Sequence, residues 1–158
     1  MKTKVLILQG IISEYRVPIY NIISEEVDLT LGYMDENRAT SAQNYKLEKI
    51  KHIKVKSIYI NGLSLLKVCN KYDVVIFSSD LHYISFCLLP FINRKFKLIV
   101  WTIGIRASYT RKFDLKRGKT FLDFIYLSIL KKSDASIFYI KEILTFWGDS
   151  IEQKKIIS

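Results

Sequence analysis

Three short segments carry most of the residues that could bind or transform a ligand, and each follows an apolar run. Gly10 and Arg16 come after the first run, and Ser79, Asp80 and His82 come after a later one. A glycine lets a ligand approach the backbone closely, and small hydroxyls beside a carboxylate can hydrogen-bond the hydroxyls of a sugar. Asp80 and His82 are also the candidates for a catalytic acid or base.

The same residues have ordinary structural interpretations. Gly10 could simply permit a turn, and Ser79 or Asp80 could cap the following helix. His82 could be a partly buried histidine whose hydrogen bonds are satisfied. The chain contains neither G-x-G-x-x-G nor G-x-x-x-x-G-K-[ST], and it lacks the G-x-S-x-G elbow of serine hydrolases. The sequence therefore leaves the role of these residues open between ligand binding and local structure.

The third segment is the most basic part of the chain. It begins with Gly104 and Arg106, after the apolar run 98–101, and only Asp114 opposes the cations that follow. These cations could hold a phosphate or pyrophosphate, or they could dock on an anionic membrane surface. A solvated run of charge is the third interpretation. The cations expected to contact phosphate or membrane are Arg111, Lys112, Lys116, Arg117 and Lys119.

Length and composition indicate one domain with a full core. The chain has 158 residues, 49% of them apolar, which excludes disorder as its overall class. The net charge of +10 favours anionic partners. Cys69 and Cys87 stand in apolar surroundings with no C-x-x-C pattern and no Cys/His cluster. We therefore expect two reduced core thiols in a cytoplasmic protein, with neither a metal nor a cofactor.

Three apolar stretches bear on whether the chain enters a membrane. The run 5–8 is followed by charged residues without a small-residue cleavage site, which argues against export. The stretch 74–93 contains Asp80, and a charge in mid-membrane costs about 2.5–3.5 kcal/mol, so a strand followed by a helix is expected there. The run 121–130 is apolar on nearly every face, so this helix is either buried or shares one face with lipid. We expect a cytoplasmic protein, peripheral at most at the inner face of the cell membrane.

Short apolar runs alternate with helix-like segments along the chain. Continuous apolar runs are typical of strands covered on both faces, as in a parallel sheet. The segment 46–60 alternates lysines with aliphatic residues and slips in phase at His52, so we expect an edge strand with a kink or turn there. The fold predicted is a Rossmann-like, doubly wound α/β domain over residues 1–158, with a mostly parallel sheet of about six or seven strands and helices on both faces. The strands are expected at 4–9, 27–33, 74–77, 98–101 and 135–139, and the helices at 18–23, 62–70, 81–91, 116–132 and 140–147.

Nucleic acid is not the anionic partner that the basic charge predicts. The sequence has no RNP-type aromatic motif, no zinc-finger spacing and no glycine-containing helix-turn-helix core. Its basic residues also stand next to apolar helices rather than along a polar groove. Phosphate groups of small molecules and acidic lipids therefore remain as the expected anions.

Several segments, in their order and spacing, resemble one family of enzymes. The chain is similar over nearly all its length to the N-terminal half of GT-B glycosyltransferases, in particular the retaining family-four group that builds bacterial surface polysaccharides. The segments that carry this resemblance are YRVPIY at 15–20, YDVVI at 72–76, WTIG at 101–104, KSDASIFY at 132–139, and the stretches 144–148 and 151–156.

The resemblance implies an acceptor-binding domain. Such an enzyme transfers a sugar from a nucleotide sugar to a glycan or lipid-linked acceptor during lipopolysaccharide or capsule synthesis. In the family, a second Rossmann-like domain binds the nucleotide sugar and steadies the departing diphosphate, and this sequence ends about where the linker to that domain would begin. Because both substrates must be fixed face to face, we expect this chain alone to be inactive.

The resemblance also places acceptor binding on particular residues. Arg106 is expected to reach the diphosphate or an acceptor phosphate. The family often has a histidine in the loops after the fourth or fifth strand, and His82 matches it only weakly, so no catalytic base is assigned beyond the candidates Asp80 and His82. The acceptor-binding residues implied are Gly10, Arg16, Ser79, Asp80, Gly104, Arg106 and Tyr139.

Two alternatives to this function stay open. The chain could be a non-catalytic subunit that docks a split glycosyltransferase on the membrane, or it could be a nucleotide-binding α/β module of another family. Co-purification with an α/β protein of similar size would favour the first alternative. A nucleotide seated after the first strand would favour the second.

Overall fold

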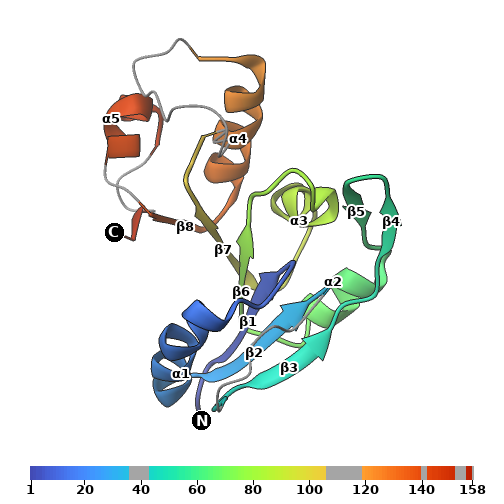
Figure 1. The fold of residues 1–158 in the computed structure, drawn as a ribbon. Coiled ribbons are helices and arrows are strands. Elements are labelled where there is room, and N and C mark those ends of the chain that lie inside the picture. Colours follow the sequence, from blue (N-terminus) through green and yellow to red (C-terminus); the bar gives the residue numbers. More distant parts are fainter. Residues whose placement is uncertain (36–42, 106–118, 140–141, 152–155, 158) are drawn as a thin grey trace.

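A computed structural model describes residues 1–35, 43–105, 119–139, 142–151 and 156–157 of the chain (Figure 1). Its centre is a seven-stranded sheet in which every neighbouring pair is parallel. In spatial order the strands are β3 (Lys46–Lys49), β2 (Asp28–Tyr33), β1 (Lys4–Gln9), β6 (Val74–Ser78), β7 (Lys97–Thr102), β8 (Ala135–Phe138) and β9 (Ile156–Ile157).

Helices cover both faces of the sheet. On β1, Val5 and Ile7 pack toward α1, whereas Leu6 and Leu8 join the larger core on the opposite face. That larger core includes residues of α2, α3, α4 and α5. In the described part of the chain, the α-helices are α1 (Val17–Glu26), α2 (Ser64–Cys69), α3 (Ile84–Leu88), α4 (Phe121–Lys132) and α5 (Glu142–Trp147). Short 3-10 helices are η1 (Glu14–Arg16), η2 (Leu89–Phe91) and η3 (Gly148–Ser150).

The predicted fold class is confirmed. The chain runs outward from β1 to β2 and β3, and then returns to β6, β7, β8 and β9 on the other side of β1. The strand order therefore reverses between β1 and β6, as in a doubly wound Rossmann-like sheet. In such sheets ligands bind beyond the carboxyl ends of the strands, close to this reversal. The reversal directs attention to the residues that follow β1, β6 and β7.

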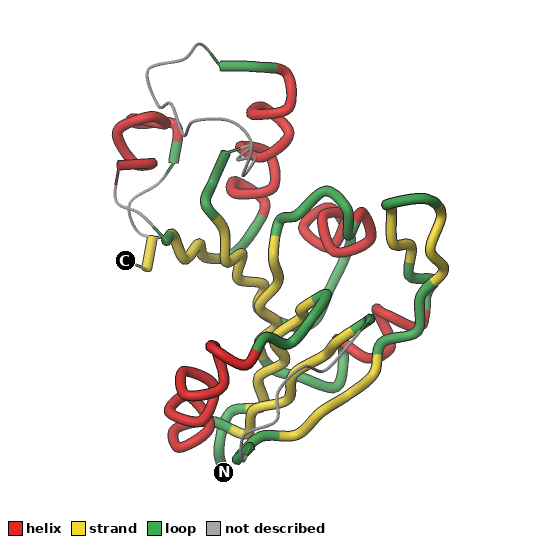
Figure 2. Tube along the Cα trace, in the orientation of Figure 1, coloured by secondary structure: helices red, strands yellow, loops and turns green. Residues whose placement is uncertain are grey.

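The expected edge strand is present as β3, but the chain does not continue it past the expected kink or turn at His52. The main sheet ends at Lys49, and β4 (Ile53–Val55) and β5 (Ile58–Ile60) form a separate antiparallel hairpin (Figure 2). Tyr59 bridges to Tyr83, so the hairpin lies beside α3. An alternating pattern is shared by an edge strand and by a hairpin, which is why the sequence pattern did not separate them.

Carboxylates hold the amino ends of the strands in register. The Lys4 backbone N–H donates to Asp73 Oδ2 over 2.9 Å, and the Leu98 N–H donates to Asp134 Oδ2 over 2.9 Å. Arg94 also contacts Asp134, with Nη2 2.9 Å from Oδ2. Partial burial opposes the charge of Asp134, but the Leu98 N–H, Arg94 and Lys97 outweigh it and lower its pKa.

The two cysteines are buried and unpaired as expected, whereas the longest helix, α4, is only partly buried. Cys69 and Cys87 are buried and unpaired, and burial raises the pKa of each thiol to about 12. In α4, Ile129 and Leu130 are buried, whereas Phe121 is 79% exposed, so this helix buries only part of its apolar surface. Among the described residues, no helix is both long and apolar enough to cross a membrane.

Candidate functional site

Arg16 lies at the carboxyl edge of the sheet and joins residues far apart in the sequence. It stands at the end of η1, directly before α1, and reaches back to the last residue of β1. Its Nη1 donates to Gln9 Oε1 over 3.0 Å, and its Nε donates to Tyr15 Oη over 3.0 Å. Its Nη2 lies 3.4 Å from the hydroxyl of Tyr139, which follows β8. Two residues predicted from separate motifs, Arg16 and Tyr139, are thus brought together.

Aromatic rings surround this guanidinium. Trp101 of β7 stacks on Tyr139 with ring centroids 5.6 Å apart and an interplanar angle of 24°. The Arg16 Cζ lies 5.8 Å from the Trp101 centroid and 5.3 Å from that of Tyr15. Distances of this size allow cation–π attraction. Arg16, Gln9, Tyr15, Trp101 and Tyr139 are called the arginine–aromatic cluster below.

The arginine–aromatic cluster is open to solvent while its cation stays charged. Tyr15 is 71% exposed and Tyr139 is 50% exposed, whereas Gln9 is buried beneath them. Partial burial works against the charge of Arg16, but the nearby oxygens of Tyr139 and Tyr20 outweigh it, so the pKa of Arg16 is raised. A fixed guanidinium beside flat rings suits a ligand that combines a phosphate with a ring.

A tyrosine occupies the space beside Gly10. A Cβ placed on Gly10 would lie 1.7 Å from the hydroxyl oxygen of Tyr83, so only glycine fits against this side chain. Tyr83 stacks on Phe86 of α3, and burial raises the pKa of Tyr83 to about 12. Gly10 was expected to let a ligand approach the backbone, but the side chain of Tyr83 occupies that space. The Gly10 carbonyl also accepts the N–H groups of Met34 and Asp35.

Tyr83 also belongs to a second polar cluster, which it forms with residues that follow β2 and with the β4–β5 hairpin. The hydroxyl of Tyr59 donates to Asp35 Oδ2, and His52 Nε2 lies 3.8 Å from Asp35 Oδ1. The other ring nitrogen of His52 is 3.2 Å from the Ile50 carbonyl oxygen. The ring centroids of Tyr59 and Tyr83 are 5.0 Å apart. Asp35, His52, Tyr59 and Tyr83, called the tyrosine–aspartate cluster below, offer hydrogen-bonding groups that could recognise sugar hydroxyls.

Ser79 and Gly104 serve the packing between strand ends. Ser79 is 3% exposed, and its Oγ lies 2.5 Å from Thr102 Oγ1. Gly104 has φ +85°, a conformation that favours glycine, and its N–H donates to Thr102 Oγ1 over 2.9 Å. The Gly104 carbonyl accepts the indole N–H of Trp147 over 2.9 Å. Through these hydrogen bonds, both residues contribute to the packing at the carboxyl edge of the sheet.

Asp80 and His82 form an exposed pair outside both clusters. His82 Nδ1 lies 2.7 Å from Asp80 Oδ1, and the same oxygen accepts the His82 backbone N–H over 2.9 Å. The side chains are 46% and 61% exposed for Asp80 and His82. Asp80 thus stabilises the turn before α3, and His82 is solvent-accessible rather than partly buried.

Most of the basic segment after β7 lies outside the described residues. Arg106, Arg111, Lys112, Lys116 and Arg117 belong to this undescribed range. Lys119 is described, and its ammonium lies over the rings of Trp147 and Phe146, 5.4 Å and 5.7 Å from their centroids. This contact ties Lys119 to α5.

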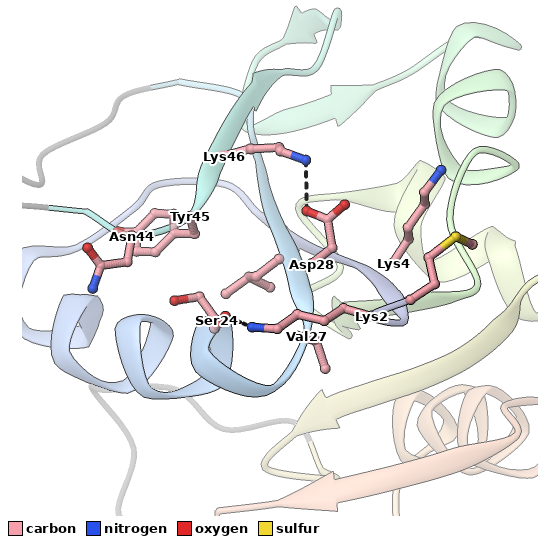
Figure 3. Close-up of a pocket in the computed structure, with 10 residues that line it drawn as sticks. Lys2, Lys4, Ser24, Val27, Asp28, Asn44, Tyr45 and Lys46 are labelled. Carbon is pink, nitrogen blue, oxygen red and sulfur yellow. Dashed lines mark hydrogen bonds and ion pairs between the residues drawn. The ribbon is translucent and has the colours of Figure 1, made fainter.

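A surface pocket of about 390 Å³ lies at the opposite edge of the sheet (Figure 3). It is lined by the amino ends of β1 to β3, and the Lys46–Asp28 ion pair, with an N–O distance of 2.8 Å, stands in it beside Lys2 and Lys4. Because ligands of doubly wound sheets bind at the carboxyl edge, we base the candidate site on the two clusters there. Among the described residues no group of three or more His, Cys, Asp or Glu could hold a metal ion.

Sequence reasoning missed all four residues of the tyrosine–aspartate cluster. Asp35 lies two residues after the end of β2, so the rule that ligands bind after strands could have found it. His52, Tyr59 and Tyr83 come together only because the hairpin packs on α3. Trp101 belongs to the WTIG segment at 101–104, but its stacking on Tyr139 depends on the pairing of β7 with β8.

Comparison with known proteins adds no relative to this description. The chain matches no protein-family model and no curated protein. The function of this chain is therefore inferred from the geometry of the site and from the sequence resemblance.

Proposed function

We propose that this chain is the acceptor-binding domain of a glycosyltransferase of the GT-B, family-four type. The complete enzyme would transfer a sugar from a nucleotide sugar to a glycan or lipid-linked acceptor in surface-polysaccharide synthesis. Donor binding would reside in a second domain or chain, so the chain described here would not turn over a nucleotide sugar by itself. The observation that carries the proposal is the contact of Arg16 with Gln9, Trp101 and Tyr139 at the carboxyl edge.

The chemistry of the arginine–aromatic cluster supports this proposal. Arg16 carries five N–H donors and uses three of them in the contacts given above, so donors remain for an anion. The faces of Trp101 and Tyr139 offer apolar area on which a sugar ring can rest. A sugar phosphate, free or attached to a lipid, combines the two features that the cluster would bind.

A nucleotide-binding module of another family has less support. Dinucleotide sites use glycines after the first strand so that a pyrophosphate can approach the backbone. At Gly10 this approach is occupied by Tyr83. Binding of a nucleotide there would require Tyr83 to leave its stack with Phe86.

The proposal can be tested by titrating the full chain with three probes and following the indole and tyrosine signals by NMR. The probes are glucose 1-phosphate, glucose and uridine diphosphate. We expect glucose 1-phosphate to shift Trp101 and Tyr139, and Arg16→Ala to weaken its binding about tenfold, since one charge-assisted contact is lost. Asp28→Ala, at the opposite edge, is the control and should bind normally.

Two outcomes would contradict the proposal. Tighter binding of uridine diphosphate than of glucose 1-phosphate, with shifts at Tyr83, would indicate a nucleotide-binding module. Transfer of sugar from a nucleotide sugar by the purified 158-residue chain would refute the expectation that it is inactive alone.

A further inference from the structure

The β4–β5 hairpin exposes an aliphatic face that the fold leaves uncovered. Ile53 pairs with Ile60, and Val55 pairs with Ile58, so these four side chains share one face of the hairpin. They are 69%, 43%, 52% and 40% exposed, in the order named. The opposite face carries Tyr59, which is buried and packs on Tyr83 within the tyrosine–aspartate cluster. The hairpin is thus anchored by one face and presents the other to the surroundings.

Positive charge surrounds this aliphatic face. Between Glu48 and Asp73 the sequence has six lysines and no acidic residue. Lys71 is paired with Glu48, whereas Lys51 and Lys56 stand beside the aliphatic face and are exposed. Lys54 pairs with Tyr59 on the opposite face, with its ammonium 4.8 Å from the Tyr59 ring centroid. Exposed aliphatic side chains interspersed with cations are typical of surfaces that lie on anionic lipid.

Lys56 occupies a backbone position that favours glycine. It is in the two-residue turn of the hairpin and has φ +55°, in the left-handed region. A glycine there would adopt this conformation without the penalty that a side chain brings. The turn nevertheless holds a cation at the tip of the hairpin, where a flat anionic surface could reach it.

We propose that this face of the hairpin docks the chain on an anionic membrane. We define the hairpin surface as Ile53, Val55, Ile58 and Ile60 with Lys51 and Lys56. The proposal deepens the proposed function, because Tyr59 packs on Tyr83 of the candidate site. The hairpin accordingly lies beside α3 (Figure 1). A docked hairpin would bring that site close to the headgroups, where a lipid-linked sugar phosphate is presented.

Charge distinguishes a membrane from the other occupants. A second copy of the chain, paired through the same surface, would place lysines against lysines, and like charges repel across an interface. Single-stranded nucleic acid binds by stacking bases on aromatic rings, and the outward face of the hairpin is aliphatic. An anionic bilayer satisfies both the cations and the aliphatic side chains.

The test is sedimentation of the full chain with vesicles that contain no sugar. One set is phosphatidylcholine, and the other is equal parts phosphatidylcholine and phosphatidylglycerol. We expect binding to the second set only, weakened by added salt. Ile53→Ser with Val55→Ser should reduce it at least about tenfold, because apolar burial is lost. Lys51→Gln with Lys56→Gly should reduce it about tenfold, because two cations are lost.

Matched controls separate docking from folding. Ile22→Ser, at a side chain 64% exposed on α1, and Lys95→Gln, at another exposed cation, should leave vesicle binding unchanged. Lys56→Gly relaxes a strained turn, so its melting temperature should not fall and weaker binding would not reflect unfolding. The variant with Arg111, Lys112, Lys116 and Arg117 changed to Ser tests the basic segment predicted from the sequence.

Three results would overturn the proposal. One is unchanged vesicle binding by both hairpin variants, with loss only in the variant of residues 111–117. Another is equal binding to the two vesicle sets. The third is dimerisation in light scattering that the hairpin substitutions abolish, without vesicle binding by the parent chain. If the chain does not bind glucose 1-phosphate, the sedimentation assay can still show vesicle binding. Acceptor binding and membrane docking can therefore be refuted independently.

Discussion

At the amino edge of the sheet, the carboxylates of Asp73 and Asp134 accept hydrogen bonds from backbone N–H groups of the neighbouring strand. At the carboxyl edge, Arg16 and Tyr139 instead meet side chain to side chain, in a cluster that solvent reaches. The first arrangement satisfies groups that would otherwise be unpaired, and the second leaves donors and ring faces for a ligand. The comparison teaches that the charges at the amino edge hold neighbouring strands together, whereas the charge at the carboxyl edge is exposed among aromatic side chains, as the proposed binding role requires.

Removing the carboxylate of Asp134 should have the largest effect on stability. Asp134→Ala leaves the Leu98 N–H and the Arg94 guanidinium without their partner, and we expect a loss of about 3 kcal/mol in the free energy of unfolding. Asp28→Ala, which removes only the exposed pair with Lys46, should cost much less. Urea denaturation of the two variants measures the difference, and equal losses would contradict the structural role given to Asp134.

Adding a methyl group at Gly10 should have the next largest effect. Gly10→Ala would force Tyr83 out of its stack, at a cost of about 2 kcal/mol. Gly62→Ala is the matched control, because a Cβ there meets nothing within 4 Å, and it should change stability by less than about 0.5 kcal/mol. In a double-mutant cycle, Tyr83→Ala should remove most of the cost of Gly10→Ala. Additive losses would show that Gly10 is restricted by something else.

A smaller effect is expected in the pH dependence of the free energy of unfolding, because Asp134 stabilises the fold only while it is ionised. The folded-state pKa of Asp134 lies below its ordinary value of about 4, so its ionised form is favoured by folding. Its stabilisation is fully present above that ordinary value and is lost as the pH falls through the folded pKa. The difference in unfolding free energy between the parent chain and Asp134→Asn should therefore shrink below pH about 4. A difference that stays constant into the acid range would refute this assignment.

The smallest effect on stability is expected at Arg16. Arg16→Lys keeps the charge but loses the planar fork that contacts Gln9 and Tyr139, and we expect stability to change by less than about 1 kcal/mol. Binding of glucose 1-phosphate should nevertheless weaken. Thermal melting and the NMR titration measure the two quantities on one sample, and parallel losses in both would assign Arg16 to the fold instead.

The sequence predicted which edge of the sheet holds the candidate site better than it predicted how the residues at that edge are arranged. Apolar runs and the order of elements gave the strands, and hence the edge that holds Arg16 and Tyr139. Their contact spans 123 positions and depends on how β1 and β8 are placed in the sheet, which no local pattern encodes. The hairpin was missed for a related reason, since alternation fits an edge strand and a hairpin equally. Its position is set by the packing of Tyr59 on Tyr83.

The motifs that carry the resemblance divide between the two edges. Asp73 and Asp134 stand within YDVVI and KSDASIFY, and both pair with the backbone of an adjacent strand. These parts of the resemblance describe how the sheet is held together. Arg16 in YRVPIY and Tyr139 at the end of KSDASIFY are the parts that bear on binding.

The two buried thiols provide a way to watch parts of the fold open separately. Cys69 is in α2 and Cys87 is in α3, and a thiol with a pKa of about 12 stays protonated and shielded in the closed state. Alkylation at neutral pH must then wait for local opening, so each labelling rate reports the breathing of one helix. Because α3 supports the hairpin, ligands or lipids that fix the hairpin should slow the modification of Cys87 more than that of Cys69.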